Sequence, residues 1–223
     1  MPPTTDSIRA FLDYLSHEAA ASPLTIETYQ SDLRSFTAYA EERLGEPFVP
    51  SEGDLDLVRG WLSVKLDEGL KASTVGRCLT SVRSFYRHLL KTGQIRRNPI
   101  QALRPPKAAR PLPVYVPTED MEQMLSEDID PADWRAVRDR LILTMLYECG
   151  LRRSEIAGLR DQAVDTTERQ LKVLGKGRKE RIVPFGKGLA EEIEAWRHLR
   201  TSIFGTTESF FVSSKGTPMA PRA

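Results

Sequence analysis

A proline-rich stretch near the middle of the sequence constrains what this chain can fold into. Four prolines fall within the ten residues 104–113. Proline lacks a backbone N–H, so this density excludes a regular helix or a central strand. Prolines mixed with basic residues suit a semi-rigid linker between domains. We therefore predict that the 223 residues form two domains, 1–107 and 115–223, joined by a linker at 108–114.

The part before the linker is predicted to be helical. Apolar residues recur at helical spacing in four segments, and three of these segments are followed by a glycine stop signal. The predicted helices span about residues 8–19, 23–44, 54–68 and 73–93. Four amphipathic helices with short loops indicate a small bundle of four to five helices.

The part after the linker mixes helices with strands. Segments 170–174 and 180–185 flank a glycine-rich turn, which predicts a β-hairpin. A further short strand is predicted at 210–213. Helices are predicted to begin at Thr118, to run from Asp130-Pro131 to Gly150, and to cover 154–159 and 187–203. The chain is therefore expected to be mainly α, with a second domain of the α+β type that holds a small antiparallel sheet.

The distribution of charge points to a polyanionic partner. The net charge is only +1, yet residues 70–110 hold ten basic side chains and no acidic one. A neutral protein surface normally mixes both signs, so a block of this kind indicates nucleic-acid binding. The alternative is a solvated surface that happens to be basic.

The predicted helix that starts near Ser73 has two chemically different faces. One face is apolar and comprises Val75, Cys78, Leu79, Val82, Phe85, Tyr86 and Leu89. The other interleaves small polar side chains with long basic ones, and it also includes Gly76 and His88. Small residues allow close approach to a duplex, and basic ones reach phosphates or guanine edges. The residues predicted to bind DNA on this face are Ser73, Arg77, Thr80, Arg83, Ser84, Arg87 and Lys91.

Other features exclude several protein classes. No apolar run approaches the ~18 residues of a membrane helix, and the polar N-terminus lacks the basic start of a secretory signal. Cys78 and Cys149 lie far apart and are predicted to be buried free thiols of a cytoplasmic protein. The three histidines show no ligand spacing, so no metal site is expected.

Three parts of the sequence resemble the tyrosine recombinases, the phage integrase family. Residues 146–159, LYECGLRRSEIAGL, are similar to the family's first catalytic box. Residues 173–185, VLGKGRKERIVPF, are similar to the hairpin that carries its catalytic lysine. Residues 25–33 and 73–86 resemble helices of its N-terminal, SAM-like core-binding domain. On the order and separation of these segments, the chain is identified as a member of this family, similar to the bacterial Xer proteins.

The resemblance implies a chemistry for particular residues. The family cleaves DNA through a covalent 3′-phosphotyrosine without a metal or nucleotide cofactor, so protein cations must stabilise the charged transition state. Arg152 would be such a cation, Glu155 would support it, and Lys176 would protonate the leaving 5′ oxygen. The hairpin residues Arg178 and Lys179 would contact DNA. The implied partners are a double-stranded recombination site and further protomers, which form a tetramer in the full-length family. No membrane partner is expected. We expect this chain itself to be a monomer.

The later part of the family pattern does not occur in these residues. The six tyrosines end with Tyr147, so none follows Lys176, and there is no His-x-x-Arg box. Arg197 and Arg200 flank a histidine at a different spacing, and we assign them no catalytic role. The chain is then either a piece of a longer enzyme or a decayed form, and we expect it to bind DNA without cutting it. One alternative is a DNA-binding protein derived from a recombinase. The other is an unrelated helical regulator, but that would leave the catalytic box around Arg152, residues 146–159, unexplained.

Overall fold

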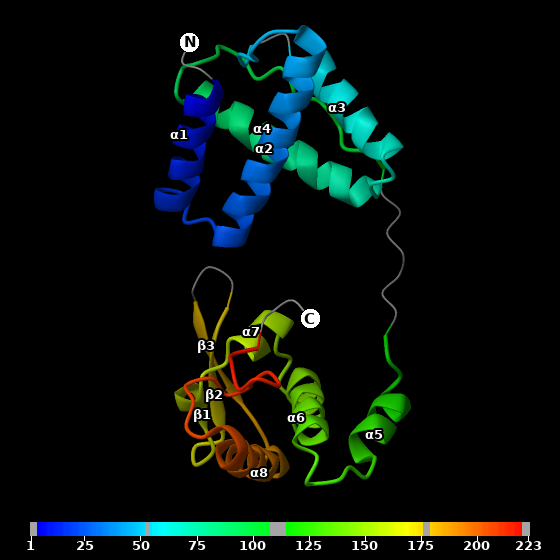
Figure 1. Ribbon diagram of the computed structural model, residues 1–223, viewed down its shortest axis with the longest axis vertical. Helices are drawn as coiled ribbons and strands as arrows, with labels where there is room; N and C mark the ends of the chain where they lie inside the picture. Colours follow the sequence, from blue (N-terminus) through cyan, green and yellow to red (C-terminus); the bar gives the residue numbers. More distant parts are fainter. Residues whose placement is uncertain (1–3, 52–53, 108–114, 176–178, 220–223) are drawn as a thin grey trace. The chain divides into compact units, whose positions relative to one another are not determined.

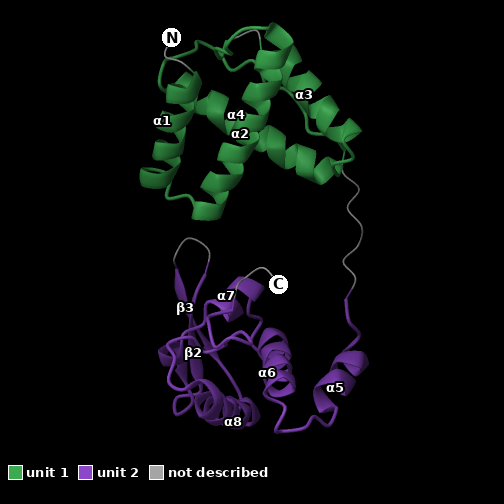
Figure 2. Ribbon diagram, in the orientation of Figure 1, with its two compact units in different colours: residues 1–112 green, residues 113–223 purple. Residues whose placement is uncertain are grey.

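The computed structural model describes residues 4–51, 54–107, 115–175 and 179–219. The chain separates into two compact units, residues 1–112 and 113–223 (Figure 2). The predicted linker at 108–114 lies outside the described residues. Both units match the predicted fold class, since the chain is mainly helical with one small antiparallel sheet (Figure 1).

The first unit is a bundle of four helices. Their bounds are α1 Thr4–His17, α2 Pro23–Leu44, α3 Leu55–Asp67 and α4 Ala72–Lys91. Ser22 caps α2, because its side chain accepts a hydrogen bond from the Thr25 backbone N–H. The helix ends at Gly45, whose φ of 70° is the left-handed conformation that favours glycine. Helix α4 contacts each of the other three helices and forms the centre of the bundle.

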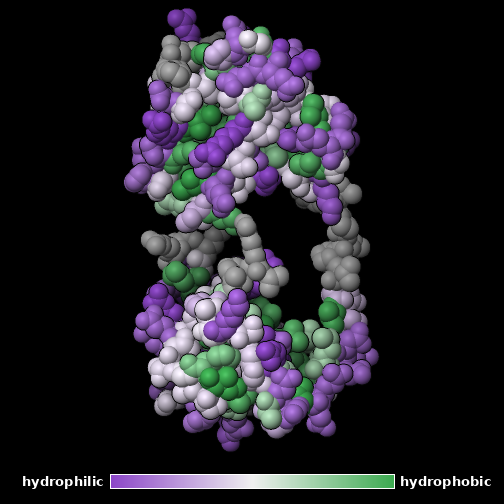
Figure 3. All heavy atoms as spheres, viewed as in Figure 1, coloured by the Kyte–Doolittle hydropathy of each residue, from purple (hydrophilic) through white to green (hydrophobic). Residues whose placement is uncertain are grey.

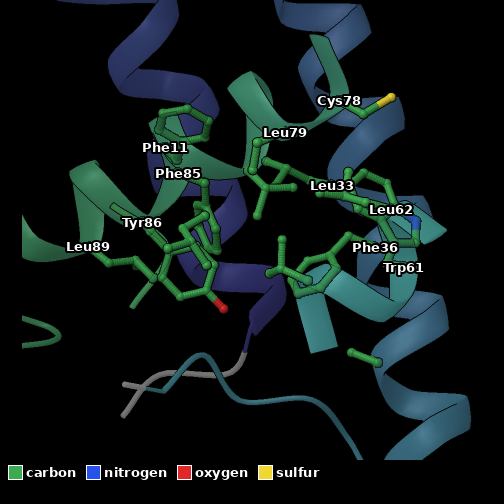
Figure 4. Close-up of a cluster of buried hydrophobic side chains, with 14 of the residues drawn as sticks. Phe11, Leu33, Phe36, Trp61, Leu62, Cys78, Leu79, Phe85, Tyr86 and Leu89 are labelled. Carbon is green, nitrogen blue, oxygen red and sulfur yellow. The ribbon is translucent and has the colours of Figure 1, made fainter. Parts of the chain in front are cut away.

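Aromatic rings and aliphatic side chains fill the core between these helices (Figure 4). Phe36 packs against Phe48 and Trp61, and Phe11 packs against Phe85. The apolar face predicted for α4 is confirmed, because all seven of its residues are buried. His88 differs from the prediction: it is buried against the rings of Phe11 and Tyr14 and does not lie on the polar face. Burial lowers the pKa of its imidazole below the ordinary value.

The second unit combines four helices with the sheet. The helices are α5 Thr118–Ser126, α6 Trp134–Glu148, α7 Arg153–Ala157 and α8 Lys187–Phe204, with a 3₁₀ turn η1 at Asp161–Ala163. The strands are β1 Val164–Asp165, β2 Gln170–Leu174 and β3 Glu180–Pro184. They pair in the order β1-β2-β3, and both pairings are antiparallel. The predicted hairpin is therefore present, although its tip at 176–178 lies outside the described residues.

Two predictions for this unit are wrong in detail. Helix α6 begins at Trp134 and not at Asp130, because Asp133 is the capping residue: its carboxylate accepts hydrogen bonds from the backbone N–H groups of Arg135 and Ala136. The segment 210–213 is not a strand. Only isolated bridges join Arg160 to Ser209 and Val212 to Pro218.

Two arginines of α8 hold the segment that follows the helix and the η1 turn. Arg200 is buried and donates hydrogen bonds to the carbonyl oxygens of Ser209 and Phe210, at 3.0 Å each. Arg197 and Arg200 both form ion pairs with Asp161 of η1. These contacts explain the two arginines as structural residues.

Cys78 and Cys149 are buried free thiols, as predicted, and burial raises the pKa of Cys149 to about 11. On the face shown in Figure 3, exposed hydrophobic residues are interspersed with hydrophilic ones. Within the described parts of the chain, every helix is too short or too polar to cross a membrane.

Candidate nucleic-acid interface and active site

Arg152 lies where the chain enters α7. Its backbone is still extended, with φ −82° and ψ 153°, so it is the capping residue and not part of the helix. Glu155, one turn later, accepts a hydrogen bond from the Arg152 backbone N–H at 2.8 Å and one from its Nη1 at 2.9 Å. The Arg152 side chain nevertheless remains 65% exposed. The sequence pattern thus places an oriented, accessible guanidinium at the start of α7.

Arg181 on β3 is a second partner of Glu155 that sequence reasoning missed. Its Nη1 and Nη2 donate to the two carboxylate oxygens at 2.6 and 2.9 Å. Arg181 lies opposite Val173 in the sheet register, on the inward face where Val173 is buried. The period-2 alternation of β3 could have revealed this position, because an inward arginine needs a buried acidic partner. The contact joins α7 to the hairpin, beside which it lies (Figure 1).

Glu155 is the electrostatic centre of this arrangement. Its side chain is only 3% exposed and accepts four hydrogen bonds from the two arginines. The bonds from the Arg181 guanidinium, followed by those from Arg152, hold the pKa of the carboxyl at about 2, although burial opposes this shift. One carboxylate between two guanidiniums leaves a net positive charge, which favours binding of an anion.

An open pocket adjoins these groups. It is lined by Gly150, Arg152, Gly175, Lys179, Glu180 and Arg181. Lys179 is exposed at its edge, whereas Lys176 and Arg178, for which catalysis and DNA contact were predicted, lie outside the described residues. Among the described residues, no three side chains of the His, Cys, Asp or Glu type gather as metal ligands would.

The polar face of α4 is narrower than its sequence suggests. The segment after the helix runs along one flank: Arg83 donates from Nη2 to the Leu103 carbonyl, and Pro105 lies 3.5 Å from where a Cβ on Gly76 would be. Arg83 is therefore half-buried. The exposed stripe along the middle of the face consists of Ser73, Thr80, Arg87 and Lys91, with Ser84 half-buried beside it.

The other flank of α4 is joined to α2. Arg77 donates from Nη1 and Nη2 to the two carboxylate oxygens of Asp32, at 2.5 and 3.2 Å. Asp32 is 8% exposed and also accepts a hydrogen bond from Ser81 Oγ at 2.5 Å. Of the predicted DNA-binding residues on α4, the structure brings five together on one open stripe and commits Arg77 and Arg83 to contacts within the protein. Lys91, at the end of the stripe, is exposed, and its Nζ lies 3.9 Å from a carboxylate oxygen of Glu18 and over the ring of Tyr14.

Comparison with known sequences identifies the class of protein that this fold and these residues define. Residues 115–223 match the Phage integrase family, and residues 8–93 match the Phage integrase, N-terminal SAM-like domain. The chain belongs to this family, the tyrosine recombinases.

Within the family, the chain is XerC-like. It is 36% identical over 217 residues to the tyrosine recombinase XerC of Pelobacter propionicus, covering 97% of this chain and 70% of the relative. It is 34% identical over 215 residues to XerC of Escherichia coli, covering 96% of this chain and 71% of that protein.

Solved structures share the fold at lower sequence identity. The Tn1549 transposon integrase in complex with transposon right end DNA aligns with a TM-score of 0.66 at 16% identity, over 96% of this chain and 73% of that one. A lambda integrase dimer bound to a COC′ core site aligns with a TM-score of 0.66 at 18% identity, over 97% and 73% of the two chains.

Proposed function

We propose that this chain takes part in site-specific DNA recombination by binding a duplex recombination site. The observation that supports this most strongly is the pair of guanidiniums held by Glu155 beside an open pocket, in a chain of the tyrosine recombinase family. In this proposal, Arg152 contacts the scissile phosphate. A guanidinium suits this role because it is always charged and binds phosphate oxygens in a bidentate manner.

The orientation of Arg152 supports its role as a transition-state stabiliser. Without a metal, the negative charge that develops on the phosphoryl oxygens must be balanced by protein cations that are already in place. Glu155 supplies that preorganisation, since it holds the Arg152 backbone and side chain at once. Lys176 is proposed to protonate the leaving 5′ oxygen, on the family resemblance alone.

Binding of the duplex is proposed to occur through α4 and the β2–β3 hairpin. On α4 the exposed stripe offers Arg87 and Lys91 for phosphates, with Ser73, Thr80 and Ser84 as small polar neighbours. Arg77 lies at the edge of this stripe, and Arg83 supports the segment that covers the opposite flank. On the hairpin, Arg178 and Lys179 are the proposed contacts.

We further propose that the polypeptide of these 223 residues binds DNA without cleaving it. The sequence has no tyrosine after the hairpin, and a 3′-phosphotyrosine cannot form without a nucleophile. The alternative is a recombinase-derived protein whose function is DNA binding itself. Mixing the chain with a protomer that carries the nucleophile distinguishes the two possibilities. Recombination of the DNA would support a role in recombination, and its absence would support a protein that only binds DNA.

Incubation with a suicide DNA substrate tests this proposal. We expect a shifted band in native gels and no covalent protein–DNA band in denaturing gels. Tyr147, which is 49% exposed and lies five residues before Arg152, is the tyrosine to replace if a covalent band does form. A covalent band that disappears in Tyr147→Phe would show that Tyr147 is the nucleophile and that the chain is active.

A further inference from the structure

The contact between Arg77 and Asp32 places unusual constraints on an arginine at a candidate DNA surface. Asp32 accepts hydrogen bonds from three side chains of α4: the Arg77 guanidinium, the Cys78 thiol at 3.5 Å and the Ser81 hydroxyl at 2.5 Å. Figure 4 shows the Cys78 sulfur directed away from the aromatic core. The carboxylate is thus fixed from α4 itself, and it in turn fixes the plane of the guanidinium.

This pairing makes Arg77 a poor phosphate contact. The ion pair is neutral as a whole, and Asp32 would repel a phosphate brought close to it. Affinity for the DNA backbone comes from positive charge that displaces counterions, which a neutral pair supplies weakly. Arg87, whose side chain is exposed on the stripe, lacks this handicap.

The same pairing suits recognition of a base. The Arg77 side chain is 44% exposed. A guanidinium has five N–H donors, and Asp32 takes one from Nη1 and one from Nη2. Nη2 also donates to the weak acceptor Cys78 Sγ at 3.6 Å, a long contact that a base acceptor would displace. The edge formed by Nε and Nη2 matches the N7 and O6 acceptors of guanine, the commonest specific arginine contact in the major groove.

The surroundings of Arg77 leave room for such an approach. The exposed neighbours on α4 are Ser73 and Thr80, and Ser31 is exposed on α2 one residue before Asp32. These side chains are short, so the backbones of α2 and α4 can come close to the floor of a groove. The long basic side chains Arg87 and Lys91 lie farther along α4, where they can reach phosphates.

We propose that Arg77 reads one guanine in the major groove of the target duplex, and that Asp32 is its positioning residue. The inference rests on the proposed function, since it requires that the chain bind DNA. It assigns to Arg77 a contribution to specificity and to Arg87 and Lys91 a contribution to affinity that does not depend on sequence.

Selection from a library of random-sequence duplexes tests this assignment with the full chain. We expect the wild type to enrich a motif with one guanine whose preference falls about tenfold or more in Arg77→Lys, because lysine keeps the charge but loses the fork. Asp32→Asn should relax the same position. The control is Asp56→Asn, which removes an exposed partner of Arg59 on α3 and should leave the motif unchanged.

A second measurement separates base reading from a purely structural role. Replacing the selected guanine by 7-deazaguanine removes the N7 acceptor. This should lower the affinity of the wild type for the duplex about as much as the substitution Arg77→Lys does, and it should leave the affinity of the Arg77→Lys variant unchanged. Loss of folding would instead weaken all sequences alike, and Arg77→Lys, at an exposed position, carries the test if Asp32→Asn unfolds.

Three outcomes would overturn the inference. An unchanged motif in Arg77→Lys means that Arg77 reads no base. A uniform loss of affinity with a lower salt dependence in Arg77→Ala means that it contacts a phosphate. If the wild type enriches no duplex at all, the proposed function fails together with the inference. In the first two outcomes the wild type still binds DNA, so the proposed function stands.

Discussion

Replacing Glu155 by glutamine removes the charge that holds the candidate active site together. The amide would face two guanidiniums with one acceptor oxygen in place of a carboxylate that accepts four hydrogen bonds. We expect the second unit to lose stability and Arg152 to lose its fixed orientation. The first unit, which shares none of these contacts, should be unaffected.

The magnitude follows from the depressed pKa of the carboxyl. The difference between the ordinary pKa of 4.5 and the folded value of about 2 corresponds to roughly 3 kcal/mol, at 1.36 kcal/mol per pKa unit. Solvent reaches both partners, since Arg152 is 65% and Arg181 37% exposed. Screening therefore reduces the expected loss on Glu155→Gln to about 1.5–3 kcal/mol.

The pH dependence has a defined sign. Because the pKa of Glu155 is lower in the folded than in the unfolded state, its stabilisation is fully present above pH 4.5 and is lost as the pH falls toward 2. The difference in stability between wild type and Glu155→Gln should therefore be largest near pH 7. At pH 3 it should be about half as large.

Hydrogen exchange in increasing urea, read by mass spectrometry, measures the two units separately. Peptides from α7 and β3 report on the second unit, and peptides from α4 report on the first. Glu191→Gln is the matched control, because Glu191 is 70% exposed and lies 3.6 Å from Lys187 on α8, so the change should cost under about 0.5 kcal/mol. Equal stability of wild type and Glu155→Gln at pH 7, or a difference that persists unchanged at pH 3, would refute the reasoning.

Two further predictions concern the first unit. Arg87→Ala should lower the slope of log affinity for DNA against log salt by about 0.9, whereas Arg83→Ala should change it little, because Arg83 is committed to the Leu103 carbonyl. Fluorescence titrations at several salt concentrations measure both slopes. Equal slopes for the two variants would contradict the assignment of Arg87 to the exposed stripe. Gly45→Ala should destabilise this unit by about 1 kcal/mol through backbone strain alone, since φ is 70° and no atom lies within 4 Å of the new methyl group. Urea unfolding measures that cost, and Gly186→Ala, at an ordinary φ of −77° with equally open surroundings, is the control that should not show it.

Local patterns in the sequence determine much of this protein. The spacing of apolar residues predicts the helices of the first unit and the buried face of α4, because helical periodicity fixes which side chains share a face. The alternation around the glycine-rich turn predicts β2 and β3, and the Arg152 box and the hairpin identify the family. These features depend on neighbours three or four residues apart, or on strands joined by one turn, so the sequence itself carries them.

Contacts between distant segments are decided only by the tertiary structure. The sequence shows ten basic residues in one block, but not that Arg77 pairs with Asp32, 45 positions away, or that Arg83 lies beneath the segment containing Leu103. It likewise shows Glu155 close to Arg152 but not the bidentate contact with Arg181, 26 positions later. A basic side chain can offer DNA only those donors that no carboxylate or carbonyl of the folded chain takes. That depends on which helices and strands pack together, and no local pattern specifies it.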